Sequence, residues 1–247
     1  MEKNKIRVIV NGYKGRMGSE TVKAVQKDSG LELVGQTDTG DDLAKAIADL
    51  KADVVVDFTL PQCVKQNTIT ILKSGAYAVI GTTGLSELDL NELNLLAMEK
   101  ETAVLVAPNF AIGAVMMMKA CKEIAKHMTS VEIIEMHHDK KVDAPSGTAI
   151  KTAEVIAAAN PCVNSLKREE KEVIKGVRGG LKNQIMIHSV RLPGFLASQE
   201  VIFGGLGQTL TIRHDTFNRE SFMPGVIQAL KCIHAYKGLI YGLENIL

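Results

Sequence analysis

The strongest constraint on the fold is the alternation of short apolar runs with helical patterns in the first hundred residues. Runs rich in β-branched residues predict strands over residues 6–10, 31–37, 53–58, 76–80 and 102–106. Patterns typical of helices lie between them, over residues 16–28, 41–50, 61–73 and 86–100, and Pro61 stands in the first turn of the third. Strands that are continuously apolar are buried on both faces, as in a parallel sheet covered by helices. We therefore expect an α/β fold built on a Rossmann-like, doubly wound parallel sheet.

The pattern changes after residue 110. The sequence predicts a helix over 112–128, a strand over 131–137, a helix over 148–159, strands over 184–191, 198–203 and 210–214, and a final helix over 220–236. Closely spaced strands with short turns indicate an antiparallel or mixed sheet. We expect one domain to comprise residues 1–110 and 215–247, and a second, α+β domain to comprise residues 111–214.

Composition excludes several classes of partner. The net charge is +1 and 46% of the residues are hydrophobic, so nothing in the overall charge favours nucleic acid or an anionic membrane. We find no apolar run as long as a transmembrane helix and no signal-peptide pattern at the N-terminus. The four cysteines are widely spaced, as in reduced thiols of a cytoplasmic protein.

A glycine-rich turn follows the first predicted strand and opens the first predicted helix. Its spacing is G-x-x-G-x-x-G from Gly12 to Gly18, with Lys14 in place of the usual middle glycine. Such a turn lets the backbone approach a pyrophosphate at a helix N-terminus, and Asp38 stands where an acid would bind the adenosine ribose. The residues that we expect to bind a cofactor here are Gly12, Tyr13, Lys14, Gly15, Arg16, Met17 and Asp38. Because Lys14 and Arg16 could meet a 2′-phosphate that Asp38 would repel, we expect tolerance of both NADH and NADPH.

Two further loops fall at the carboxyl ends of predicted strands, where open parallel sheets bind ligands. The candidates are Gly81, Thr82 and Thr83 in one loop, and Ala107, Pro108, Asn109 and Phe110 in the other. Their small residues could flank a nicotinamide ring and its ribose, although either loop could equally be a plain turn. Residues 57–59 end the third strand in the same way.

The segment from Glu135 to Ala149 combines two adjacent histidines, two lysines and the start of a helix. Histidine is the side chain best suited to proton transfer near neutral pH, so His137 is a candidate proton donor. Lys141 offers a compact positive charge, and the turn at residues 146–148 offers backbone N–H groups at a helix start. This set suits a small substrate that carries carboxylates.

A metal site is the alternative interpretation of the same segment. Its five candidate ligands are Glu135, His137, His138, Asp139 and Asp143. Adjacent residues of an extended segment point to opposite faces and converge poorly on one ion, and two lysines in the loop oppose a cation. We therefore expect no metal.

The chain resembles the 4-hydroxy-tetrahydrodipicolinate reductase (dihydrodipicolinate reductase) family over nearly its full length. The resemblance rests on Gly12 to Gly18, residues 57–59, Gly81 to Gly84, Ala107 to Phe110, and Glu135 to Ala149. The last segment matches every fixed position of the family's Glu-x-His-His-x-x-Lys-x-Asp-Ala-Pro-Ser-Gly-Thr-Ala motif. Lys14 and the Asp139–Lys140 pair depart from some members.

The resemblance implies an activity and residue roles. The family reduces a cyclic imine dicarboxylate to tetrahydrodipicolinate with NADH or NADPH, in diaminopimelate and lysine biosynthesis. It makes His137 the catalytic proton donor or acceptor, Lys141 a catalytic proton donor, and His138, Gly147 and Thr148 the substrate contacts. The chemistry of the turn adds Ser146 to the candidate substrate contacts. It also implies a dinucleotide-binding first domain, and a second domain that binds substrate and joins the subunits of a homotetramer.

Two other functions remain open. Another nicotinamide-dependent imino-acid or amino-acid dehydrogenase would keep the first domain without needing the Lys141 to Thr148 anion site. A non-catalytic dinucleotide sensor would need neither His137 nor Lys141. For an enzyme with its cofactor and substrate on different domains, we expect hinges near residues 109–113 and 214–218.

Overall fold

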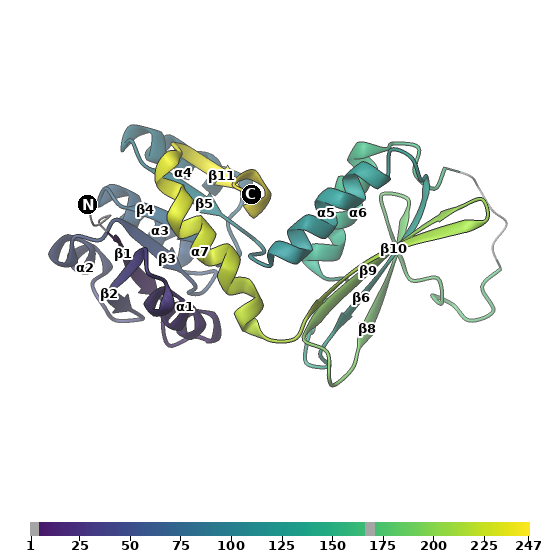
Figure 1. Ribbon diagram of the computed structural model, residues 1–247, viewed down its shortest axis with the longest axis horizontal. Helices are drawn as coiled ribbons and strands as arrows, with labels where there is room; N and C mark the ends of the chain where they lie inside the picture. The colour runs from purple at the N-terminus through teal and green to yellow at the C-terminus, as the bar shows by residue number, and fades with distance from the viewer. Residues whose placement is uncertain (1–4, 166–170) are drawn as a thin grey trace. The chain divides into compact units, whose positions relative to one another are not determined.

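A computed structural model describes residues 5–165 and 171–247 of the chain (Figure 1). Its first sheet has six strands in the order β11-β5-β4-β3-β1-β2, and all of them are parallel. The strands are β1 (Ile6–Asn11), β2 (Leu31–Thr37), β3 (Val54–Asp57), β4 (Tyr77–Ile80), β5 (Ala103–Val106) and β11 (Gly238–Tyr241). The predicted doubly wound parallel sheet is confirmed.

Helices cover both faces of this sheet. They are α1 (Arg16–Lys27), α2 (Leu43–Leu50), α3 (Val64–Lys73), α4 (Glu87–Glu99) and α7 (Met223–Cys232). Apolar residues of α2, α3 and α4 pack on one face around Ile9, Val55 and Ile80, all fully buried. Because neighbouring residues of a strand point to opposite faces, Val8, Val10 and their counterparts face the other side, where α1 packs against α7. The apolar strands of the sequence are therefore buried on both faces.

The second sheet is mixed, as expected. Its order is β10-β9-β6-β8-β7, with β6 parallel to β8 and the other pairs antiparallel. The strands are β6 (Ser130–His137), β7 (Gly180–Lys182), β8 (Ile185–Arg191), β9 (Ala197–Gly205) and β10 (Gln208–Thr216). Helices α5 (Ile112–Ile124) and α6 (Gly147–Ala159) contribute to the apolar core that forms on one face of this sheet.

The chain forms two compact units. One contains the residues up to Ile112 together with Arg219–Leu247, and the other contains Gly113–Asn218. The cofactor loops predicted from the sequence all belong to the first unit, and the histidine-rich segment belongs to the second. The described residues include no helix long and apolar enough to cross a membrane.

Several elements differ from the sequence predictions. Strand β11 was not predicted, because a four-residue run becomes a strand only by pairing with β5. The helix predicted over 220–236 is instead 3₁₀ turns at Arg219–Phe222 and Ile233–Ala235 flanking α7, which carries Pro224 in its first turn. A last 3₁₀ turn spans Leu243–Asn245.

Pro61 does not lie in the first turn of a helix, so that prediction is wrong. It stands in a turn before α3, and a β-carbon on Gly84 would come within 2.8 Å of its Cβ. The next loop thus packs directly against Pro61, which serves as part of a pocket wall.

Candidate active site

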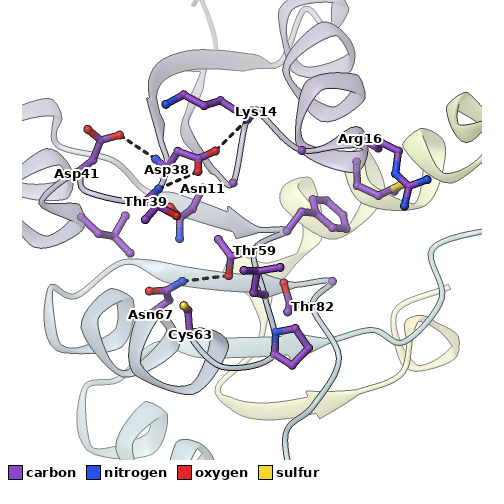
Figure 2. Close-up of a pocket in the computed structure, with 18 of the residues that line it drawn as sticks. Asn11, Lys14, Arg16, Asp38, Thr39, Asp41, Thr59, Cys63, Asn67 and Thr82 are labelled. Atoms are coloured by element: carbon purple, nitrogen blue, oxygen red, sulfur yellow. Dashed lines mark hydrogen bonds between the residues drawn. The ribbon is translucent and has the colours of Figure 1, made fainter.

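A pocket of about 830 Å³ opens at the carboxyl ends of the parallel strands in the first unit (Figure 2). It is lined by residues that follow β1, β2, β3 and β4. The chain leaves β1 for β2 on one side and later continues to β3 on the other, so the strand order reverses at β1. Open α/β sheets bind ligands at such a reversal, because the loops diverge there and leave a crevice.

The glycine-rich turn forms one wall of this pocket, and close approach explains its glycines. Gly12 has φ +82°, and a β-carbon there would come within 2.5 Å of the Phe58 carbonyl oxygen. A β-carbon on Gly18 would lie 2.1 Å from the Gly12 carbonyl oxygen. Real β-carbons do not approach this closely, so a side chain at either position would force the turn away from β3 or α1.

Asp38 lies against the same turn. Its carboxylate accepts hydrogen bonds from the backbone N–H of Lys14 at 3.1 Å and of Thr39 at 2.8 Å. The Thr39 bond first, and then the bond and charge of Lys14, hold the pKa of Asp38 below its usual value despite partial burial. An ionised carboxylate at the pocket edge is a suitable acceptor for ribose hydroxyls.

A buried aspartate joins three strand ends beneath the pocket. Asp57 is fully buried and accepts hydrogen bonds from Asn11 Nδ2 at 2.7 Å and Asn67 Nδ2 at 2.9 Å. Its other oxygen accepts from the Thr59 hydroxyl at 2.7 Å and N–H at 3.1 Å, and from the Thr82 hydroxyl at 2.8 Å. These contacts connect β1, β3 and the loop after β4, so Asp57 fixes the floor of the pocket.

The pocket unites most of the predicted cofactor residues. Gly12, Lys14, Gly15, Arg16, Met17, Asp38, Gly81, Thr82 and Thr83 all line it. Tyr13 and Ala107 to Phe110 are not among the lining residues. Tyr13 lies under the Lys14 ammonium at 5.6 Å, and the buried Phe110 ring stacks edge-on against Phe58 at 5.8 Å.

Sequence reasoning missed other lining residues, among them Asn11, Thr39, Asp41, Cys63 and Asn67. Asn11 carried a usable signal, since it is a polar residue at the carboxyl end of a buried strand. Asn67 carried none, because only the folding of α3 against Asp57 brings it to the pocket.

A second polar cluster stands at the carboxyl end of β6 in the second unit. On β6, Val131 and Ile133 face the apolar core, so Glu135 and His137 continue the same face. Glu135 is paired in register with Ser189, and His137 with Arg191. The core-facing side of the sheet therefore turns polar at this end.

Glu135 is the centre of the cluster and is fully buried. One of its oxygens lies 2.6 Å from His137 Nδ1 and 2.8 Å from an Arg191 nitrogen. The other accepts from the second terminal nitrogen of Arg191 at 2.8 Å and from the Ser146 N–H at 3.2 Å. Burial raises the pKa of Glu135, but hydrogen bonds from Arg191, Ser189 and His137 outweigh it and leave the pKa below its usual value. Glu135 is therefore an ionised, buried partner of His137.

The pKa of His137 lies below its usual value, chiefly because the ring is buried. Glu135 opposes this effect, whereas the charges of Lys141 and Arg191 add to it. The imidazole is consequently neutral over most of the neutral pH range, with Nδ1 held by Glu135 and Nε2 left for other partners.

The loop that follows brings the other predicted residues close to this cluster. Lys141 pairs with the Asp143 carboxylate at 2.6 and 2.7 Å. Ser146 caps α6 by accepting from the Ala149 N–H at 3.2 Å, so its N–H and hydroxyl both serve the fold. A β-carbon on Gly147 would meet nothing within 4 Å, which leaves open space at the start of the helix. The peptide before Pro145 is cis.

The two remaining predicted substrate residues are Thr148 and His138. Thr148 is the second residue of α6, and its carbonyl accepts from Thr152. His138 follows the end of β6, and its Nδ1 is buried with no hydrogen-bond partner among the residues that the structure describes. Over the same residues, no group of three or more His, Cys, Asp or Glu side chains is arranged to hold a metal ion.

Arg191 is the functional candidate that sequence reasoning missed in this unit. It ends β8 on the same face as Ile185 and Ile187, which are buried in the core. A charged residue at a core-facing strand position was the available signal, because such a charge is rarely buried without a partner. Its partner, Glu135, is 56 residues away in the sequence.

Comparison with known proteins assigns the chain to a family. Residues 6–110 match the family described as "Dihydrodipicolinate reductase, N-terminus", and residues 113–247 match "Dihydrodipicolinate reductase, C-terminus". The chain belongs to the dihydrodipicolinate reductase family. It is therefore an oxidoreductase, and its first unit is the part that resembles the family's dinucleotide-binding domain.

Relatives in the family match this chain over its length. A 4-hydroxy-tetrahydrodipicolinate reductase of Syntrophomonas wolfei is 51% identical, covering 99% of this chain and 100% of the relative. One of Bacillus licheniformis is 47% identical and covers all of both chains. A dipicolinate-bound dihydrodipicolinate reductase from Paenisporosarcina sp. TG-14 superposes with a TM-score of 0.91 at 42% identity, covering 98% of this chain and 100% of the other.

Proposed function

We propose that this member of the dihydrodipicolinate reductase family reduces 4-hydroxy-tetrahydrodipicolinate to tetrahydrodipicolinate in the diaminopimelate and lysine pathway. The observation that carries the proposal is the hydrogen bond between buried Glu135 and His137 Nδ1, in the segment that also carries Lys141. This arrangement leaves the second imidazole nitrogen of His137 for proton transfer.

The pocket in the first unit fits a nicotinamide dinucleotide, which supplies the hydride when bound. The fit rests on two observations. Gly12 and Gly18, which have no β-carbon, allow the backbone of the turn to pack tightly beside the pocket, and the Asp38 carboxylate lies at the pocket edge. Helix α1 begins at Arg16, beside the turn, and no side chain caps its N-terminus, which favours a pyrophosphate there. Lys14 and Arg16 also line the pocket, so we propose that both NADH and NADPH are accepted.

His137 and Lys141 supply the proton in this proposal. The 4-hydroxyl group leaves as water, which gives a conjugated imine. Hydride addition to that imine leaves electron density on the ring, and a positioned acid must protonate it. Such an acid contributes roughly 10²- to 10⁴-fold to the rate. His137 is neutral at rest, but an incoming dicarboxylate would favour the imidazolium, because nearby negative charge raises the pKa of a histidine. Lys141 would leave Asp143 for the substrate, exchanging one carboxylate for another.

The start of α6 binds a substrate carboxylate in this proposal. Gly147 and Thr148 are the first two residues of α6, so their backbone N–H groups point toward the N-terminal end of the helix. The open space beside Gly147 admits a ligand, and the helix N-terminus favours negative charge. His138, with an unpartnered buried nitrogen, is a further contact for the same anion.

The test is turnover. Oxidation of NADH and of NADPH by the purified protein would be followed with dihydrodipicolinate synthase generating the substrate in place. His137→Ala and Lys141→Ala are expected to lose most activity while nucleotide binding is unchanged, and Lys126→Ala, which removes an exposed lysine of the same unit, is the matched control. Absence of turnover despite tight nucleotide binding would refute the proposal and favour a dinucleotide sensor or another imine substrate.

We further propose, from family resemblance, that the second unit joins the subunits of a homotetramer. Light scattering on the purified protein tests this directly, since the monomer mass is 26.7 kDa. A single species at the monomer mass would contradict it.

A further inference from the structure

We propose that Arg191 is a positioning residue for proton transfer, holding His137 through Glu135; the inference rests on the function proposed above. Strands β6 and β8 are parallel, with His137 opposite Arg191 in register. The Leu192 N–H donates to the His137 carbonyl at 3.1 Å, which fixes the two strand ends together. Arg191 is thus placed beside His137 by the sheet itself.

Arg191 grips the carboxylate of Glu135 with both ends of its guanidinium. Each terminal nitrogen donates to a different oxygen of Glu135 at 2.8 Å. A fully buried carboxylate needs such a partner, because an unpaired charge in the interior is strongly unfavourable. The planar fork also fixes the orientation of the carboxylate, which the single ammonium of a lysine could not do.

That orientation determines what His137 can do. With Glu135 holding Nδ1 at 2.6 Å, the imidazole cannot rotate freely, and Nε2 is the nitrogen left to exchange a proton. Without Arg191, the Glu135 carboxylate could move, and His137 would lose its fixed orientation.

Arg191 also organises the loop that carries Lys141. One of its terminal nitrogens donates to the Asp143 carbonyl at 2.8 Å, and the Asp143 carboxylate holds Lys141. The other donates to the Val190 carbonyl at 2.8 Å. A single side chain therefore links the strand end bearing one proposed proton donor to the loop bearing the other.

The charges that face His137 determine in which direction its pKa should shift in each variant. They are Glu135 on β6, Arg191 on β8, and Lys141 with its partner Asp143 in the loop. Losing Arg191 removes a positive charge and frees the negative charge of Glu135, so the pKa of His137 should rise. Losing the charge of Glu135 should lower it.

The decisive measurement is the titration of His137, followed by NMR on protein labelled at the imidazole carbons, in the full chain without ligands. We expect Arg191→Met to raise the pKa of His137 and Glu135→Gln to lower it. In steady-state turnover, Arg191→Met should lower kcat on the order of 10- to 100-fold and shift its pH profile, with the KM for NADH unchanged. Arg191→Lys keeps the positive charge but not the two-nitrogen fork of the guanidinium. In this variant the pKa of His137 should therefore return closer to its parent value than kcat does.

Arg213→Met is the matched control. Arg213 is an arginine of the same sheet that pairs with Asp215 and Glu200 outside this cluster. It should leave both the titration and kcat as they are. If Arg191→Met lowers kcat while His137 titrates as in the parent, Arg191 has only a structural role and the proposal is wrong.

The experiment distinguishes a variant that does not fold from a failure of the proposed function. If Arg191→Met does not fold, Arg191→Lys carries the test, and a parent-like kcat and pH profile in that variant would overturn the proposal. If the parent shows no turnover, the proposed function fails, but the opposite pKa shifts in ligand-free protein still decide whether Arg191 and Glu135 set the state of His137.

Discussion

The buried carboxylate of Asp57 allows a sharp test of how the first unit is held together. The change is Asp57→Asn, which keeps the shape of the side chain and replaces one acceptor oxygen with an NH₂ group. If the amide oxygen takes the side that serves Thr59 and Thr82, the new NH₂ faces the amide donors of Asn11 and Asn67. The opposite orientation places it against the two hydroxyls and an N–H instead. In either orientation, the new NH₂ group faces other hydrogen-bond donors where the carboxylate oxygen had accepted from them.

The surrounding groups cannot easily adapt. Asn11 is 5% exposed, and its amide oxygen already accepts from the Thr37 hydroxyl at 2.9 Å, so rotating the amide would deprive Thr37 of its acceptor. Leaving one buried donor unsatisfied costs about 1–3 kcal/mol, and hydrogen bonds to a charged group contribute about 1.5–3 kcal/mol. We therefore expect Asp57→Asn to lower the free energy of unfolding of the first unit by about 2–4 kcal/mol.

Asp53→Asn is the matched control, since it makes the same replacement just before the same strand. Asp53 is exposed, and the acceptor that it offers to the Arg7 N–H survives as an amide oxygen. Its effect should stay within about 0.5 kcal/mol. Urea unfolding followed by circular dichroism, with hydrogen exchange of the β1 and β3 amides as the local measure, compares the two variants. Equal losses in both would refute the argument from buried donors.

Three further predictions follow from the same structure. A methyl group at Gly18 would lie 2.1 Å from a carbonyl oxygen of its own turn, so Gly18→Ala should weaken NADH binding measured by calorimetry. Gly180→Ala is the control and should leave the affinity unchanged, because Gly180 has open space around it. Equal affinities in the two variants would contradict the close-approach argument. Burial raises the pKa of the Cys121 thiol to about 12. Alkylation of the native protein at pH 8, followed by mass spectrometry, should therefore modify the exposed Cys63 and Cys162 and leave Cys121 unmodified. Early modification of Cys121 would contradict its burial. The hinges expected from the sequence near residues 109–113 and 214–218 predict that NADH together with a dicarboxylate inhibitor reduces the radius of gyration in small-angle scattering, and an unchanged radius would contradict that expectation.

Local pattern predicted most elements of the fold, because the signals lie within a few residues of one another. The strands of the first sheet that precede residue 110 could be read from buried β-branched runs, and the glycine turn from its position between a strand and a helix. β11 could not, since four residues near the end of the chain become a strand only through pairing with Ala103–Val106. Pro61 was misplaced for a similar reason, as its packing against Gly84 is a contact between separate loops.

The candidate sites divide in the same way. The sequence by itself determined the chemistry that is available, because histidine, lysine and a helix start occur together between Glu135 and Ala149, and the glycine spacing can be read directly. Only the tertiary structure decided which groups act on one another. It brought Arg191 to Glu135 across 56 residues, and it gathered the donors around Asp57 from three strand ends. Partnerships of this kind depend on strand order and register, and those are set by packing of the whole unit rather than by any local run of residues.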